Sequence, residues 1–342
     1  MLQNLQKRIK SLKPVVVMHD FFIDRIVQIN DLDSLLDAAS AKIESGGGSI
    51  RGIEQTEIKG GNAVNVAYAL AKLGAKTSLI TIADSYGAGI LKNAFLPFKH
   101  SKLIVKNGTQ GYTISLEVSK NKGKANVMIS DVGDTGNFGA DRLGKRELSL
   151  IQSAPAVMIT NWASNMKGTE LALKAFKTSK KDALCFLDPA DISTRRDDFK
   201  NSLMKLGVHL DILSINENEC RLLLQSLTLG PLPMGYSSED VGDAAKKLAE
   251  KLSITVDVHT PRGAATSTGS ETVFVQSFDV GVRITTGAGD VWDAADVIGY
   301  LCKLDASDRL LFANACSALY VSSENASAPA LKEVLAFISK NQ

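Results

Sequence analysis

The segment that decides the fold runs from residue 156 to residue 188. It reads AVMIT at 156–160, a helical pattern around 168–178, and ALCFLD at 183–188. Short apolar runs that take turns with helical patterns are typical of parallel strands joined by crossover helices. We therefore predict an α/β fold with a doubly wound, mostly parallel sheet flanked by helices.

The same alternation extends in both directions from this segment. The further expected elements are a strand over PVVVM at 14–18 that continues through 21–29, a helix from Asn62 to Leu73, a strand over 77–82, a helix over 90–98, a helix over 197–206, a strand over 212–216, helices over 217–226 and 238–252, strands over 255–260, 271–276 and 280–284, and two final helices from Asp290 and from Ser307.

Two stretches break the pattern. Residues 28–59 are polar, rich in turn formers, and contain Gly46-Gly47-Gly48, whereas residues 109–130 alternate like strands and contain no helical segment. We expect these two stretches to pair as a small β-sheet lid. The core would then consist of residues 1–27, 60–108 and 131–342.

The composition narrows the class of partner. The chain has 342 residues, and its 39 basic and 37 acidic residues leave a net charge of +2. Because basic and acidic residues are nearly equal in number, the sequence does not show the excess of positive charge typical of nucleic-acid-binding proteins. We therefore expect a small-molecule partner. The four cysteines are scattered, no run is long and apolar enough to span a bilayer, and the N-terminus lacks the apolar region of a signal peptide. We therefore expect a reduced, cytoplasmic protein that does not enter membranes.

The most informative motif is TTGAGD at 285–290, directly before an apolar helix. Small residues let the backbone turn sharply, so that successive N–H groups point into one concavity at the helix N-terminus, a place suited to phosphate. Asp290 would stand beside that phosphate as the base, because phosphoryl transfer needs mainly orientation and a weak proton acceptor. The alternative is a tight turn in which Asp290 is only an N-cap.

Two further candidates suit a hydroxyl-bearing substrate. GGNAVN at 60–65 is a glycine pair that opens a helix with two asparagines, whose amides both donate to and accept from hydroxyls. An ordinary capped helix start would look the same. Asp24 stands among apolar neighbours, where a carboxylate needs partners that substrate hydroxyls would provide; alternatively it faces solvent.

The fourth motif is NENE at 216–219, which follows the apolar strand 212–215. Open α/β sheets place their ligands at the carboxyl ends of strands. Carboxylate and amide oxygens there suit magnesium held through water. Asn216 and Glu219 are therefore the candidate magnesium residues.

Taken together and in this order, these segments resemble the ribokinase-like (PfkB) carbohydrate kinase family. The strongest matches are GGNAVNVAYALAKLG at 60–74 and TTGAGDVWDA at 285–294, and the resemblance spans the chain from about Val15 to Val334. It implies an enzyme that transfers phosphoryl from ATP, with Mg²⁺, to a hydroxyl of a sugar or sugar acid. The lid in this family is often also a dimer surface, which implies a homodimer.

The resemblance also implies roles for individual residues. These are substrate contacts at Asp24, Gly60, Gly61 and Asn65; an anion hole at Gly287, Ala288 and Gly289 with Asp290 as the base; and nucleotide and magnesium contacts at Asn216, Glu219, Thr286 and Asn314, the last beside adenine.

The chain departs from the family pattern at several positions. His19 stands where glycine is usual, and Ile284 stands where many members carry an Asp that helps hold a monovalent cation. Activation by potassium is therefore an open question. After the base, Ala295 replaces a glycine and Asp296 an apolar residue. Asp293 and Asp296 fall on one helical face, either toward solvent or toward substrate.

Three other functions are compatible with these residues. A nucleoside kinase needs aromatic lid surface, for which Phe21, Phe22 and Tyr112 are available, although residues 28–59 contain no aromatic residue. A non-catalytic nucleotide- or sugar-binding protein would keep the fold without turnover. A kinase of phosphorylated substrates needs a basic cluster near the site. The candidates for that cluster are Arg51, Lys59, Arg195 and Arg196.

Overall fold

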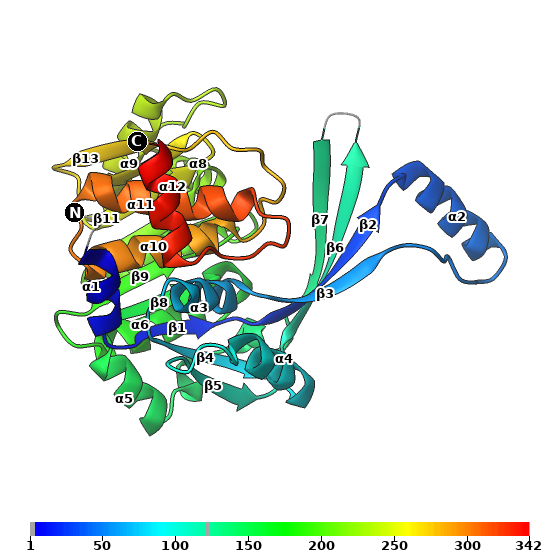
Figure 1. Ribbon diagram of the computed structural model, residues 1–342, viewed down its shortest axis with the longest axis horizontal. Helices are drawn as coiled ribbons and strands as arrows, with labels where there is room; N and C mark the ends of the chain where they lie inside the picture. Colours follow the sequence, from blue (N-terminus) through cyan, green and yellow to red (C-terminus); the bar gives the residue numbers. More distant parts are fainter. Residues whose placement is uncertain (1–3, 121–122, 342) are drawn as a thin grey trace.

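The computed structural model describes residues 4–120 and 123–341; residues 1–3, 121–122 and 342, which the predicted core and lid ranges include, lie outside the described residues. A large sheet has the strand order β13-β12-β11-β10-β9-β8-β1-β4-β5 (Figure 1). Its strands are β1 (Val15–His19), β4 (Thr77–Ala83), β5 (Lys102–Asn107), β8 (Ala156–Thr160), β9 (Leu184–Asp188), β10 (Ile212–Asn216), β11 (Thr255–Thr260), β12 (Gly263–Ser267) and β13 (Thr272–Gln276).

All neighbouring strands in the part of the sheet ordered β11-β10-β9-β8-β1-β4-β5 run parallel to one another. Strands β12 and β13 add an antiparallel edge. The central strand β1 is buried along its whole length, as a strand covered on both faces must be. The predicted fold class, a doubly wound and mostly parallel sheet flanked by helices, is confirmed.

Helices cover both faces of the large sheet because side chains alternate along each strand. Val15 and Val17 pack with one set of helices, and Val16 and Met18 pack with the other. The first set is α1 (Leu5–Ser11), α3 (Asn62–Lys72), α4 (Ser85–Phe95), α10 (Ala288–Leu301), α11 (Ala306–Val321) and α12 (Leu331–Asn341). The second set is α5 (Lys145–Ser153), α6 (Gly168–Thr178), α7 (Arg196–Leu206), α8 (Glu217–Ser226) and α9 (Ser238–Leu252).

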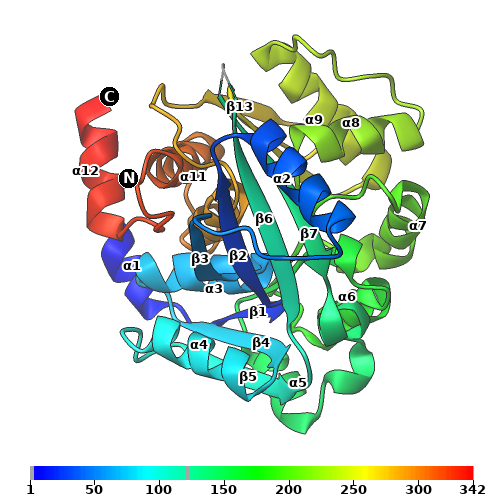
Figure 2. The same cartoon turned by 90° about the vertical axis from the view of Figure 1, so that its right-hand side faces the viewer.

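A second sheet of four strands, in the order β3-β2-β6-β7, projects from one side of the body (Figure 1) and lies toward the viewer in Figure 2. Its strands are β2 (Phe22–Ile29), β3 (Gln55–Gly60), β6 (Gly111–Lys120) and β7 (Gly123–Asp131). The chain passes from β1 into β2 within three residues, so the small sheet starts at the carboxyl end of β1. This is the edge of the large sheet where ligands bind in open α/β folds.

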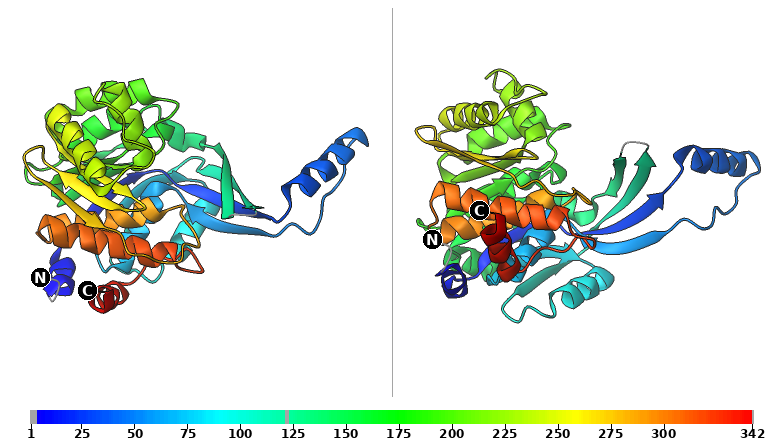
Figure 3. Two further views of the ribbon diagram at one scale, coloured as in Figure 1. Left: turned by 90° about the horizontal axis from the view of Figure 1, so that it is seen from above. Right: turned by 45° about the horizontal axis from the view of Figure 1, so that its top comes forward.

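Between β2 and β3 the chain forms α2 (Leu32–Glu44), which extends away from the body (Figure 3) and contains no buried residue. The sequence pattern predicts only a polar excursion here, without a helix. Asp31 caps α2 by accepting from the Ser34 N–H at 3.1 Å, which is a sequence signal for a helix start.

The region around β13 also differs from the prediction. Residues 280–284 do not form a strand, because the N–H groups of Arg283 and Ile284 both donate to the carbonyl of Val321. The buried strand β12 was missed because its sequence, GAATS, has few strand-favouring residues. A third terminal helix, α12, follows the two predicted ones. Within residues 4–120 and 123–341, no helix has both the length and the apolarity of a membrane span.

Candidate active site

A cleft of about 1210 Å³ lies at the carboxyl edge of the large sheet. Its walls come from the start of α8, the turn between β11 and β12, strand β13 with the loop that follows it, and helix α11. Its floor contains the loop Gly287–Gly289 and Asp290 at the start of α10. Of the predicted site residues, Asn216, Glu219 and Asn314 also line the cleft, whereas Thr286 does not and is exposed.

The loop before α10 requires glycine at position 287. Gly287 is the N-cap and has a left-handed backbone with φ of 84°. A Cβ there would also lie 2.6 Å from the Tyr320 hydroxyl, which donates to the carbonyl of Thr286 at 2.8 Å. The N–H of Ala288 donates to the carbonyl of Thr285 at 3.1 Å. At this helix start, the N–H groups of Gly287, Gly289 and Asp290 have no backbone acceptor among the described residues and remain for an anion.

Asp290 lies in the first turn of α10 and is not its N-cap. Its side chain is turned toward α3, where the Asn65 amide donates to Oδ2 at 3.0 Å; Oδ1 has no partner among the described residues. Burial raises the pKa of Asp290 well above its usual range, and the charge of Asp188 adds to this, while the Asn65 bond and Lys59 act in the opposite direction. A carboxylate with a raised pKa is, once ionised, a stronger proton acceptor than an exposed one.

The glycine pair adjoins Asp24 and Asn65. Gly61 is the N-cap of α3 with φ of 91°, and a Cβ on Gly60 would lie 1.9 Å from the Asp24 carboxylate, so both positions need glycine. Burial raises the pKa of Asp24 to about 6, and a hydrogen bond with Thr113 acts to lower it. The Asp24 side chain is half-buried. The structure brings Asp24, Gly60 and Asn65 close to Asp290, and of these four residues Asp290 lines the cleft.

Asp20 is a residue of this region that the motifs did not identify. Its carboxylate accepts from the N–H groups of Asn62 and Ala63 at 2.7 and 2.9 Å, and from the side chain of Asn161 at 3.0 Å. It thus caps α3 from the end of β1. Its position one residue after a buried strand was the available signal.

Asn216 and Glu219 form a reciprocal cap at the start of α8. The Glu219 carboxylate accepts from the backbone and side-chain N–H groups of Asn216 at 2.9 and 2.6 Å. Burial and the nearby charge of Asp188 raise the pKa of Glu219 well above its usual range. In the described part of the chain, no group of three metal-ligating side chains lies close enough to hold an ion directly. The pair therefore fits magnesium only through water.

The two extra carboxylates on α10 face neither solvent nor the cleft. Asp293 is fully buried and accepts from the Ser214 hydroxyl at 2.6 Å. Asp296 is fully buried as well and pairs with Arg309. The solvent-facing alternative is therefore wrong for both residues, and neither of them lines the cleft.

Asn314 stabilises one wall of the cleft. Its carbonyl accepts from Trp292 Nε1 at 2.9 Å, and its amide donates to the carbonyls of Val275 and Gln276 at 2.9 and 3.2 Å. The motifs also missed His259, whose ring lies 5.1 Å from that of Trp292 and lines the cleft. Its position near the end of β11 was the signal that could have found it.

The four basic side chains considered for binding a phosphorylated substrate do not form one cluster. Arg195 donates to the carbonyls of Ala163 and Asn165, Arg196 donates to Gln225, and Lys59 donates to Asn65. Arg51 is exposed in the connection between α2 and β3. Lys59 lies beside Asp290 and Asp24, whereas Arg195 and Arg196 have partners on other elements and Arg51 is exposed, so the four do not gather at one place.

A mostly parallel sheet with a helix start at the floor of a cleft is compatible with phosphoryl transfer, and the family comparison identifies the class as a phosphotransferase that uses an alcohol group as acceptor. The chain belongs to the PfkB family of carbohydrate kinases, since the family described as pfkB family carbohydrate kinase matches residues 29–333. The resemblance inferred from the motifs is thereby confirmed.

Similar proteins agree with this assignment. The chain is 29% identical over 302 residues to the ATP-dependent ribose-1-phosphate kinase of Halopiger xanaduensis, covering 86% of this chain and 90% of that protein. It is 25% identical over 289 residues to the ribokinase of Haemophilus influenzae, covering 82% and 87%. The structure of Arabidopsis thaliana ribokinase complexed with ribose and ATP matches with a TM-score of 0.74 and 21% identity, covering 96% of this chain and 99% of that chain.

Proposed function

We propose that this protein transfers the γ-phosphoryl group of ATP to a hydroxyl of a sugar or sugar acid, with Asp290 as the base. The observation that carries the proposal is the position of Asp290. It lines the nucleotide-sized cleft and at the same time accepts a hydrogen bond from Asn65, next to Asp24 and Gly60. A hydroxyl held by these groups would meet a phosphate held at the start of α10.

The reaction needs one proton acceptor and one anion site. The substrate oxygen forms a bond to the γ-phosphorus while the bond from that phosphorus to the β-phosphate oxygen breaks. The hydroxyl proton passes to Asp290, whose Oδ1 has no partner among the described residues. The N–H groups of Gly289 and Asp290, together with the dipole of α10, stabilise the charge on the phosphoryl oxygens.

Magnesium, held through water near Asn216 and Glu219, would neutralise charge on the phosphates. The task of Asn216 and Glu219 in this arrangement is to hold their oxygens in place. Asn216 and Glu219 fix each other through two hydrogen bonds, so they present their oxygens from a rigid helix start. ATP as the donor is supported by the ATP-containing ribokinase structure of similar fold.

The acceptor is better matched by a sugar than by a nucleoside. The exposed helix α2 and the chain around it carry no aromatic side chain that could stack on a base. A phosphorylated sugar would need cations in the site, and of the four basic candidates Lys59 is the one beside Asp290, because Arg195 and Arg196 have protein partners elsewhere.

The small sheet also supports a homodimer. Ile114 of β6 and Ile129 of β7 are direct neighbours in register, and their side chains are 45% and 59% exposed, beside Val127 at 52%. Apolar side chains on one exposed sheet face are stabilised by a partner surface, and a second copy of the chain offers the same one. Ile114→Lys should turn a dimer into a monomer in light scattering; a wild-type monomer would exclude this assembly.

The test of the enzyme is ATP consumption with magnesium against a panel of sugars, sugar acids, sugar phosphates and nucleosides. Asp290→Ala serves as the control and should lower turnover of the accepted compound by several orders of magnitude. Binding of ATP without turnover of any compound would instead favour a nucleotide-binding protein that lacks activity.

A further inference from the structure

Lys59 occupies an unusual position at the end of β3, directly before the glycine pair. Its ammonium lies 3.2 Å from Asn65 Oδ1 and 4.2 Å from the centre of the Tyr68 ring. The same Asn65 donates through Nδ2 to Asp290 Oδ2 at 3.0 Å. A continuous chain of hydrogen bonds therefore runs from Lys59 through Asn65 to Asp290, joining β3, α3 and α10.

The chemistry of lysine fixes which atoms donate and which accept along this series of hydrogen bonds. An ammonium can only donate, so the Asn65 atom that faces Lys59 must be the carbonyl oxygen. The amide nitrogen of Asn65 must then face Asp290 and donate to it. Without Lys59, the Asn65 amide could rotate by half a turn and present its oxygen to the carboxylate, an arrangement that only a protonated Asp290 tolerates.

We propose that Lys59 is a positioning residue that sets the orientation of Asn65 and thereby holds Asp290 Oδ2, leaving Oδ1 for the substrate hydroxyl. The inference rests on the proposed role of Asp290 as the base. It adds to the proposed site a residue, Lys59, that lies on the small sheet and outside the loop and helix motifs. Because β3 belongs to that sheet, the position of the sheet is coupled to the state of the base.

The charges around Asp290 support this role. Asp188 at the end of β9 and Asp20 after β1 face it with like charge, Tyr320 of α11 lies nearby, and Lys59 is the cation among these groups. Lys59 in turn faces Asp24 of β2. Burial lowers the pKa of Lys59 to about 8, although Asp290 and Asp24 act to raise it. Lys59 is therefore charged at neutral pH and loses its proton above about pH 8.

The experiment compares Lys59→Met, Lys59→Gln and Lys59→Arg in the full-length protein. Lys59→Met removes donor and charge, Lys59→Gln keeps a donor without the charge, and Lys59→Arg keeps both. Lys205→Met changes an exposed lysine of α7 and is the matched control. The first readout is a ¹³C carboxyl NMR titration of aspartate-labelled protein, with the Asp290 signal assigned by its loss in Asp290→Asn.

In Lys59→Met and Lys59→Gln, we expect Asp290 to titrate at a pH higher by about 1 than in the wild type, since an opposite charge that favoured the carboxylate is gone. Lys59→Arg and Lys205→Met should leave the midpoint unchanged. If Lys59→Met fails to fold, Lys59→Gln gives the same comparison. An unchanged midpoint in both charge-removing variants would overturn the inference.

Kinetics provide the second readout. We expect kcat of Lys59→Met to fall about tenfold with KM within about twofold, the acid limb of the pH profile to move upward, and Lys59→Arg to restore most of the rate. A raised KM with normal kcat would mean that Lys59 contacts substrate, which contradicts the inference. A wild type without phosphoryl transfer would defeat the proposed function, and the NMR titration would still decide the relation of Lys59 to Asp290.

Discussion

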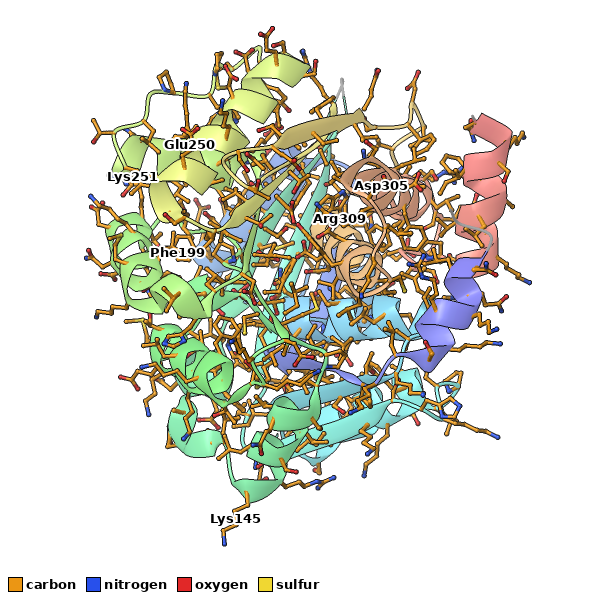
Figure 4. The ribbon with its side chains drawn as sticks, turned by 90° about the vertical axis from the view of Figure 1, so that its left-hand side faces the viewer. Lys145, Phe199, Glu250, Lys251, Asp305 and Arg309 are labelled. Atoms are coloured by element: carbon orange, nitrogen blue, oxygen red, sulfur yellow. The ribbon has the colours of Figure 1, made fainter. Side chains whose placement is uncertain are left out.

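Arg309 of α11 donates to Asp296 of α10 in the interior of the protein, where their side chains are 3% and 0% exposed. The same guanidinium donates to Asp257 of β11 at 3.4 Å and lies over the ring of Tyr300 at 3.7 Å. Figure 4 shows Arg309 among the packed side chains of the body, in contrast to Lys145 at its periphery. One arginine thus connects the helix that carries Asp290 with the large sheet.

Replacing Arg309 by Met should lower the free energy of unfolding by about 3–5 kcal/mol, because Asp257 and Asp296 would remain buried without a cation. The matched control is Arg283→Met, which breaks a pair with Glu324 whose side chains are 58% and 73% exposed. That change should cost less than about 1 kcal/mol. Urea unfolding curves measure both values, and equal midpoints for the two variants would contradict the prediction.

Asp290→Asn should abolish turnover and at the same time stabilise the fold. The folded protein holds the Asp290 proton at pH values where the unfolded chain has released it, so wild-type stability falls as the pH rises from the usual aspartate range toward the raised pKa. The Asp290→Asn variant has no titrating carboxyl group at this position, so its stability does not fall over this pH range. One pKa unit corresponds to about 1.4 kcal/mol, so we expect a gain of at least about 1 kcal/mol at pH 8 and almost none at pH 3.

Thermal unfolding at several pH values measures that gain. Asp243→Asn, an exposed change on α9, is the control and should show no such pH dependence. A stability gain that stayed constant between pH 3 and pH 8 would be inconsistent with a buried titrating carboxyl group.

Gly287→Ala should reduce turnover at least about tenfold and destabilise the protein by about 1–2 kcal/mol, since alanine is strained in the left-handed region. Part of the cost comes from contact with the Tyr320 hydroxyl. In a Tyr320→Phe background, which removes that hydroxyl and its bond to Thr286, the cost of Gly287→Ala should shrink by about 0.5 kcal/mol or more. A double-mutant cycle by urea unfolding measures the difference, and strict additivity would speak against the contact.

Glu219→Gln should raise the magnesium concentration needed for half-maximal velocity by about tenfold, because a neutral amide holds metal-bound water less well. Its reciprocal cap with Asn216 would keep one acceptor oxygen, so the fold should persist. Glu239→Gln, an exposed change at the start of α9, is the control. The same magnesium requirement in both variants would remove Glu219 from the proposed metal site.

The sequence was informative wherever function depends on local backbone geometry. The glycines at 60, 61 and 287 precede helices directly, and the structure gives two of them left-handed conformations. The alternation of strands and helices from residue 156 onward likewise predicted the parallel sheet, because each crossover unit is contiguous in the chain.

Features that depend on contacts between distant residues could not be predicted in this way. No local pattern indicates that Asp296 would meet Arg309, since a carboxylate on a helix face is equally compatible with solvent. Lys59 was visible beside the glycine pair, but its role depends on Asn65 and Asp290, which only the folded chain brings together. Helix α2 was missed although Leu32, Leu35, Leu36 and Ile43 fall at helical spacing, because the surrounding stretch 28–59 is polar and rich in turn formers.

The hydrogen bond from Asn65 to Asp290 spans 225 positions of the chain, and β1 pairs with β8, which begins at Ala156. During synthesis, the proposed substrate contacts therefore leave the ribosome long before the loop and the carboxylate proposed to complete the site. A product terminated anywhere before α10 lacks both the proposed phosphate site and the proposed proton acceptor. If these roles hold, incomplete chains have no means of transferring phosphoryl from ATP, however well their first half has folded.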